Sequence, residues 1–287
     1  MKSRVLVLVV FALALTACGS GGGGPKVPTI QPARSYHLSG FQPSGPVAAG
    51  KPVTVSFTIK QPNGQPLTDY KRGAGPHTGI HLIMVRDDLA AIIHRHPPVA
   101  ANGKTSEQVV FPKPGRYRVV IDAYPNVGGN ALALGRQGNF QLFDTIDVKG
   151  KYRPQPLPKF SPTTKVDGYT FSLHGNPRLK AIQAAFLTMT VTDPRGRPAH
   201  FTPWFGALAH AIFFRAGSLD YFHTHVCAPG ATGCTSFLGA SQVAGQSSTP
   251  GKLRVGVLVP VAGKWRLFLQ SKVNGRVLTA PFTLEVK

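Results

Sequence analysis

The sequence predicts an all-β protein made of two tandem antiparallel β-sandwiches of immunoglobulin-like or cupredoxin-like type. Its 287 residues include 32 glycines and 26 prolines, a turn-rich composition typical of all-β proteins. Short alternating apolar and polar segments recur along the chain, and helical periodicity is weak even over 176–187, its best example. The same series of motifs also occurs twice. An apolar content of 42% is enough for real cores and argues against a disordered chain.

The first residues have the features of an export signal. Lys2 and Arg4 precede an apolar run over 5–15, which is too short to span a bilayer. The run ends in LTAC, which resembles the bacterial lipobox, in which the cysteine is lipidated on its thiol. We therefore expect residues 1–17 to be a lipoprotein signal peptide and Cys18 to carry a lipid on the extracytoplasmic face of a bacterial cell membrane. An ordinary signal peptide with an unrelated cysteine is the alternative.

Four segments are expected after the signal peptide. Residues 18–34 hold the lipidated cysteine and a flexible Gly/Pro tether. Residues 35–148 form the first sandwich, and 149–165 form a proline-rich, extended linker. Residues 166–287 form the second sandwich.

Each sandwich contains an alternating strand that ends in a glycine-centred turn. The strand in 52–67 turns through PNGQP, and the strand in 186–199 turns through PRGRP. The matching turns indicate a duplicated domain.

A second pair of strands carries a core aromatic residue. Residues 109–123 and 257–271 each contain a proline, a glycine and then an aromatic residue in an alternating strand. We expect these aromatics, Tyr117 and Trp265, to lie in the two cores.

Three histidines keep their spacing in both copies. The gaps are thirteen residues and then two in each copy. The six residues are His81, His94, His96, His210, His223 and His225. Because the comparison is internal to one chain, the pattern needs no other sequence to support it.

In the first copy, a two-residue turn at 87–88 would join the two strands that carry the histidines. This register predicts that His81 faces His94, with His96 diagonal to it. His94 and His96 share a face because the side-chain period of a strand is two.

The second copy predicts the same arrangement around a turn at 216–217, with His210 facing His223 and His225 diagonal. Three imidazoles from two adjacent strands suit Cu(II) or Zn(II). Zinc would take a fourth ligand such as water.

Other interpretations of the histidines stay open. They could form a structural, hydrogen-bonded network or a pH-responsive cluster, since imidazole titrates near neutrality. His77 and His200 could add ligands, although they occupy non-equivalent places.

Two cysteines follow the second histidine set. Cys227 and Cys234 bound a Gly/Pro-rich loop, and in an exported protein a disulfide is the favoured interpretation. The alternative is a mixed His/Cys metal site. The first copy argues against that alternative, because it keeps the histidines but has prolines at 97–98.

The net charge of +21 favours anionic partners such as a phospholipid surface or wall polymers. The basic residues are interspersed, which is typical of a solvated surface, and we expect no specific nucleic-acid partner. The sequence also contains no acid pair of the kind that a glycosidase or an aspartic protease needs, no G-x-S-x-G and no phosphate-binding glycine loop before a helix. We therefore expect no enzymatic activity.

Two stretches resemble a motif of small exported bacterial β-sandwich domains. PWFGALAH over 203–210, and GIHLIMVRDDLAAIIHRHP over 79–97, are similar to P-[YW]-[LF]-G-A-x-x-H followed by H-x-H-P. Such domains are found near copper-handling and other heavy-metal proteins, so the resemblance implies a metal role for the six histidines. The first copy lacks the Pro-aromatic-Phe-Gly start, and Val226 replaces the final proline in the second.

The predicted function is metal binding, copper before zinc, by a membrane-anchored extracytoplasmic lipoprotein with a three-histidine cluster in each sandwich. The alternative is a non-catalytic cell-surface module with structural or pH-responsive histidines, whose partner would be a protein or an anionic surface polymer. The sequence leaves open the oligomeric state and whether the two copies share one site.

Overall fold

The computed structural model describes the folded part of the chain with several gaps. The described residues are 33, 35–71, 79–126, 139–175, 177–228, 245–247 and 250–287. Within them the protein is all-β, and no helix is long and apolar enough to cross a membrane. The expectations for residues 1–17, Cys18, His77 and Cys234 lie outside the described residues and stay predictions.

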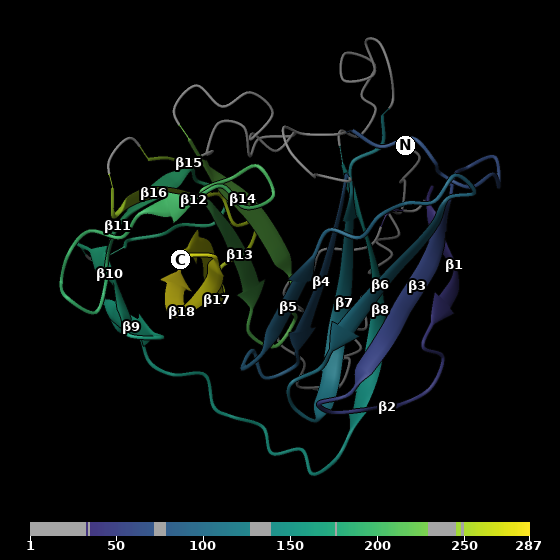
Figure 1. The fold of residues 1–287 in the computed structure, drawn as a ribbon, viewed down its shortest axis with the longest axis horizontal. Coiled ribbons are helices and arrows are strands. Elements are labelled where there is room, and N and C mark those ends of the chain that lie inside the picture. Colours follow the sequence, from purple (N-terminus) through teal and green to yellow (C-terminus); the bar gives the residue numbers. More distant parts are fainter. Residues whose placement is uncertain are drawn as a thin grey trace, which may run out of the picture.

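The first sandwich consists of two sheets, in the orders β1-β3-β6 and β2-β8-β7-β4-β5 (Figure 1). Its strands pair antiparallel except for the short pair β2–β8, which is parallel. The strands are β1 (His37–Gln42), β2 (Val47–Ala48), β3 (Pro52–Lys60), β4 (Ile80–Arg86), β5 (Ile92–Arg95), β6 (Lys104–Val110), β7 (Gly115–Ala123) and β8 (Phe140–Lys149).

The second sandwich has the sheets β16-β11-β10-β9 and β12-β17-β13-β14-β15, and β18 also pairs with β17. Residues 177–187, part of the weak helical candidate, form turns and the start of β11. The strands are β9 (Thr163–Val166), β10 (Tyr169–His174), β11 (Ala185–Thr192), β12 (Phe201–Thr202), β13 (Ala209–Arg215), β14 (Tyr221–Cys227), β15 (Gly245–Gln246), β16 (Lys252–Val257), β17 (Gly263–Val273) and β18 (Arg276–Val286).

The predicted core aromatics are confirmed. Tyr117 and Trp265 are fully buried in their respective cores. Each also donates a hydrogen bond to the backbone carbonyl four residues earlier: Tyr117 Oη to Lys113 O at 3.0 Å, and Trp265 Nε1 to Val261 O at 2.9 Å. The shared bond shows that the two sandwiches repeat the same local structure.

The segment between β8 and β9 contains no strand and runs along one side of the molecule (Figure 1). It is held to the first sandwich near its start. The backbone N–H of Gln155 donates to Asp88 Oδ2 at 2.9 Å, and the Arg86 guanidinium lies 5.5 Å from the centre of the Tyr152 ring.

The central strands β4 and β13 are buried on both faces, which brings the two sandwiches together. Leu82 in β4 belongs to the core of the first sandwich. Its neighbours Ile83 and Val85 point the other way and pack in a separate cluster with Ile212 and Phe214 of β13. This interface places β4 and β5 beside β13 and β14 (Figure 1).

Candidate metal centre between the sandwiches

The turn between β4 and β5 is longer than the sequence predicted. Arg86 N donates to Ala91 O at 2.9 Å, which closes a four-residue turn instead of a two-residue turn at 87–88. Leu89 occupies the left-handed region of this turn, with φ of 58°. As a result Ile83, and not His81, lies opposite His94.

The second copy shows the same correction. The turn spans 216–219, and Leu219 again has a positive φ, of 57°. His210 therefore pairs with His225, and the predicted opposition of His210 and His223 is wrong. Each register differs from the expected one by two residues, which leaves every side chain on the same face. The predicted common face of the histidines thus survives the error.

All six histidines meet in one cluster at the interface, which we call the six-histidine cluster. The side chains are between 0% and 7% exposed. Rings from different sandwiches are close neighbours, with centroids 4.5 Å apart for His81 and His223 and 5.1 Å apart for His94 and His210. The expectation of a separate cluster in each sandwich is therefore corrected: the two copies contribute to a single site.

Three groups of imidazoles have ligand nitrogens within 4.8 Å of one another. The groups are His81–His94–His223, His94–His96–His210 and His210–His223–His225. Two of them mix the sandwiches, and the third is the triad predicted for the second copy. Three nitrogens at such separations are a geometry that Cu(II) or Zn(II) accepts after small side-chain movements.

The sequence contained a signal for this interface. The segments IHLIMV in β4 and AHAIFF in β13 are continuously apolar apart from one histidine each. In a strand with one solvent-exposed face, apolar and polar residues would alternate. A continuous run indicates burial on both faces. One face of β4 and of β13 packs in the core of its own sandwich. The other face therefore had to be covered by another part of the chain.

Three imidazoles are oriented by hydrogen bonds to oxygen acceptors. The bonds join His81 Nδ1 to Asp122 Oδ2 at 3.3 Å, His94 Nδ1 to Gln270 Oε1 at 3.0 Å, and His210 Nε2 to Trp204 O at 2.9 Å. Because these oxygens can only accept, each named nitrogen donates its proton and the opposite ring nitrogen keeps a lone pair. Such outer contacts fix the tautomer and orientation of metal-ligating histidines in proteins.

The opposite nitrogens of His94 and His210 point into the cluster. His94 Nε2 lies 3.0 Å from His96 Nε2, and His210 Nδ1 lies 3.3 Å from His223 Nε2. The lone pairs of His94 and His210 therefore point into the cluster, where each accepts a hydrogen bond from a neighbouring imidazole, His96 Nε2 and His223 Nε2 respectively.

Asp122 is a fully buried carboxylate at the edge of the cluster. Its Oδ1 accepts from Asn139 Nδ2 at 2.8 Å and from Gln141 Nε2 at 3.2 Å. Its Oδ2 accepts from Tyr124 Oη at 3.1 Å and from Tyr221 Oη, of the other sandwich, at 3.2 Å. Burial raises the pKa of the Asp122 carboxyl, and these four hydrogen bonds oppose the increase. Sequence analysis missed Asp122, because nothing in its spacing relates it to the histidines.

Burial also keeps His223 neutral. Desolvation lowers the pKa of His223 well below its usual value, and the neighbouring imidazoles, His81 first, lower it further. A neutral imidazole has the free lone pair that metal binding requires.

An aromatic turn covers one side of the cluster. The turn is closed by hydrogen bonds between Trp204 and Ala207, at 2.9 and 3.2 Å. Phe205 stacks on His96 with ring centroids 3.8 Å apart, and the Trp204 ring meets His94 edge-on at 5.4 Å. The PWFGA part of the sequence motif thus builds a lid over the histidines, which we call the Trp204 turn.

The other predicted site residues lie elsewhere or are not described. His200 is exposed and belongs to none of the three groups. Cys227 is buried at the end of β14, and Cys234 lies outside the described residues, so the disulfide stays a prediction. Among the residues that the structure describes, the three groups contain histidines only.

The fold and the site together define a tandem β-sandwich protein with a buried histidine cluster at its internal interface. Residues 38–133 and 164–287 match the sequence model of the family described as Domain of unknown function (DUF8832). The chain belongs to this family. No curated protein matches it significantly.

The solved structures to which this chain is similar are distant from it. The Escherichia coli adhesin FdeC is 16% identical, with 88% of this chain and 64% of that chain covered and a TM-score of 0.26. The fibronectin(III)-like modules of Clostridium thermocellum CbhA are 12% identical, with coverages of 87% and 93% and a TM-score of 0.21. The bacterial integrin-binding protein invasin is 13% identical, with coverages of 88% and 38% and a TM-score of 0.24. This chain therefore spans less than two thirds of the length of FdeC.

Proposed function

We propose that the protein binds one transition-metal ion, copper before zinc, in the six-histidine cluster. The observation that carries the proposal is the convergence of six buried imidazoles whose ligand nitrogens form three overlapping groups. Imidazole is the side-chain ligand that suits copper and zinc best among those present.

The overlap of the groups favours a single ion. His94, His210 and His223 each belong to two groups, so every pair of groups shares one histidine. A neutral imidazole binds one metal through one lone pair, and an ion held by one group therefore removes a ligand from each of the others. We expect one ion per chain, held by a group that bridges the sandwiches, as two of the three groups do.

Charge also supports a cation at this place. The four other hydrogen-bond donors to Asp122 are neutral amides and hydroxyls. An ionised carboxylate buried in this way is costly without a nearby positive charge. A metal ion on His81 would supply that charge through the imidazole that Asp122 orients.

Calorimetric titration with Cu(II) and with Zn(II) tests the proposal. The double variant His94→Ala/His223→Ala removes one ligand from each sandwich, and His174→Ala is a matched control because His174 is exposed on β10. We expect near-stoichiometric binding of one ion by the wild type and the control, and loss of binding in the double variant. No binding by the wild type contradicts the proposal.

A second candidate function is a non-catalytic cell-surface interaction module whose histidines are structural. Its support is the near-complete burial of the imidazoles, together with their hydrogen bonds to one another. This function predicts that the wild type takes up no ion and that the double variant is only less stable. The net charge of +21 would then direct the search to anionic surface polymers or an acidic protein partner.

The proposed location is the extracytoplasmic face of a bacterial membrane, through a lipid on Cys18. The support is the signal-like sequence that precedes this residue. Fractionation of cells that produce the protein tests it: we expect the wild type in the membrane fraction and Cys18→Ser released from it. Equal partition of both would contradict the lipid anchor.

A further inference from the structure

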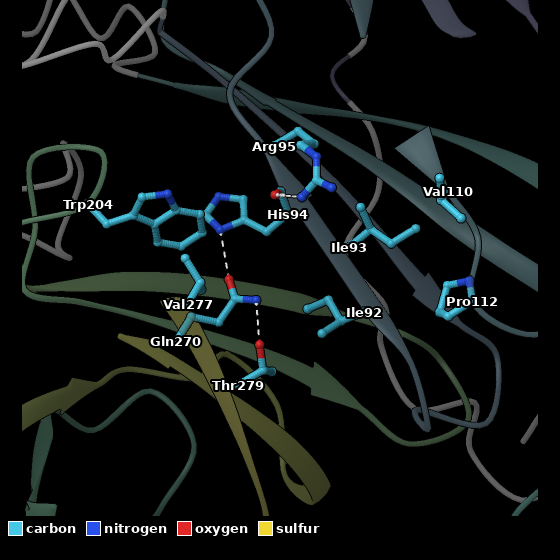
Figure 2. Close-up of a pocket in the computed structure, with 10 residues that line it drawn as sticks. All are labelled: Ile92, Ile93, His94, Arg95, Val110, Pro112, Trp204, Gln270, Val277 and Thr279. Carbon is cyan, nitrogen blue, oxygen red and sulfur yellow. Dashed lines mark hydrogen bonds between the residues drawn. The ribbon is translucent and has the colours of Figure 1, made fainter. Parts of the chain in front are cut away.

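A pocket of about 300 Å³ opens beside the six-histidine cluster. It lies between β5 and β6 of the first sandwich and β17 and β18 of the second (Figure 2). The residues that matter for its role are His94, Val110, Trp204, Gln270, Val277 and Thr279.

The inner wall of the pocket is His94. Among the described residues that line the pocket, it is the one that also belongs to the cluster, and it takes part in two of the three groups. Figure 2 shows its ring beside the Trp204 ring, with a hydrogen bond to Gln270. The imidazole of His94 thus contacts both the pocket and the other ligand nitrogens of the cluster.

A short hydrogen-bond chain holds His94 in its observed position. Gln270 Oε1 accepts from His94 Nδ1, and Gln270 Nε2 donates to Thr279 Oγ1 at 3.1 Å. Thr279 lines the pocket, so the chain runs from its wall to the cluster (Figure 2). Gln270 is therefore a positioning residue for the imidazole that an arriving ion would meet first.

The outer rim of the pocket is open to solvent. Val110 is 44% exposed on the first sandwich and Val277 is 39% exposed on the second, whereas His94 is only 1% exposed. The pocket therefore connects a solvated rim with a buried ligand.

The Trp204 turn forms a boundary beside this connection. The Trp204 side chain is half-buried and contacts the rings of both His94 and His210, at 5.4 and 5.0 Å. At its centre, Phe205 and Gly206 both have positive φ, of 48° and 81°. For Phe205 this is an uncommon and strained conformation, which displacement of the turn would relieve.

We propose that the pocket is the route by which the metal ion reaches and leaves the six-histidine cluster, with Trp204 as its gate. This inference rests on the proposed metal binding. The rim admits the ion, His94 receives it, and the Trp204 turn closes the path behind it. The gate controls the rate of exchange, while the buried imidazoles determine the affinity.

The rate of Cu(II) exchange with a chromophoric chelator tests the route. Val277→Trp places a large ring at the exposed rim, and Thr188→Trp is the matched control because Thr188 is an exposed strand residue on the other sheet of the second sandwich. We expect Val277→Trp to slow uptake and release at least tenfold with little change in affinity or stoichiometry. Thr188→Trp should exchange like the wild type.

Opening the gate should have the opposite effect. Trp204→Ala is expected to accelerate uptake and release several-fold, with stoichiometry unchanged. Binding by the wild type, with equal exchange rates for Val277→Trp and Thr188→Trp, would overturn the route and leave the metal site intact. Absence of binding by the wild type would instead overturn the proposed function, so the two failures are distinguishable.

Discussion

The two sandwiches place different residues opposite their first histidine. In the first, His81 pairs with Asp122 of β7. In the second, His210 pairs with Gln270 of β17 at the equivalent position. Asp122 binds the histidine of its own sandwich, whereas Gln270 reaches across the interface to His94.

This difference shows that the two sandwiches contribute different, complementary residues to the surroundings of the six-histidine cluster. One sandwich supplies a buried carboxylate, and the other supplies a neutral amide and an aromatic lid. Tyr221 of the second sandwich donates to Asp122 of the first, so hydrogen bonds cross the interface in both directions. Two independent copies would not need hydrogen bonds of this kind across their interface.

The largest expected effect is on stability at the Asp122 position. Asp122→Ala leaves two amides and two hydroxyls without their acceptor, and we expect a loss of about 3 kcal/mol. Gln270→Ala removes only two hydrogen bonds, with an expected loss of about 1 kcal/mol. Urea denaturation of both variants measures the difference. Equal losses would mean that the two positions have equivalent roles.

The next effect concerns metal affinity. His94 belongs to two ligand groups and His225 to one, so we expect His94→Ala to weaken Cu(II) binding more than His225→Ala does. The expected additional loss is about tenfold or more, comparable to the loss of a supporting contact. Competition with a chelator of known affinity measures it. A larger loss for His225→Ala would contradict a site that bridges the sandwiches.

A smaller effect is expected from pH. Burial lowers the pKa of His223 in the folded protein. Below about pH 6.5, His223 is therefore protonated in the unfolded chain but stays neutral in the folded protein. Stability of the metal-free protein should therefore fall, by about 1 kcal/mol between pH 7.5 and pH 5.5. The raised pKa of Asp122 acts in the opposite direction, because there the folded state binds the proton more readily.

The free energy of unfolding at about pH 7.5 is therefore compared with that at about pH 5.5 in the Asp122→Asn variant, by urea denaturation. In this variant residue 122 no longer titrates. Adding His223→Gln should reduce the pH dependence. A stability that rises with acidification in the Asp122→Asn background would contradict a neutral, buried His223.

The smallest expected effect on stability concerns a feature that the two sandwiches share, the hydrogen bond from the core aromatic residue to the backbone. Tyr117→Phe removes only the hydrogen bond to Lys113 O, and we expect a loss of about 1 kcal/mol. Thermal denaturation followed by near-ultraviolet circular dichroism would measure it. A loss several times larger would indicate that the hydroxyl group has a further structural role.

Much of the fold was predictable because it depends on local patterns. Strand alternation and glycine-centred turns predicted two sandwiches, and the aromatic at 117 and 265 was correctly placed in each core. The face shared by the histidines was also correct. The predicted register of the histidine strands was wrong by two residues. The turns have four residues, and Leu89 and Leu219 adopt a positive φ in them. A positive φ is uncommon for leucine, so the sequence does not indicate such a turn.

The histidines of the site could be predicted from the sequence, but the residues that orient them could not. The histidines were visible as a repeated spacing, but their convergence depends on how the two sandwiches dock. Asp122 and Gln270 lie on strands distant in sequence and reach the site only through pairing with β4 and β13. The docking itself was indicated by the continuous apolar runs in β4 and β13, whose second faces needed a partner.

We propose that both sandwiches hold a single ion, and the most direct test changes the histidines of one sandwich alone. Cu(II) binding would be titrated in the wild type and in His81→Ala/His94→Ala, with folding checked by circular dichroism. We expect one ion per chain in the wild type and loss of that affinity in the variant, although all three histidines of the second sandwich remain. Two ions in the wild type, with one retained at unchanged affinity in the variant, would contradict a shared site.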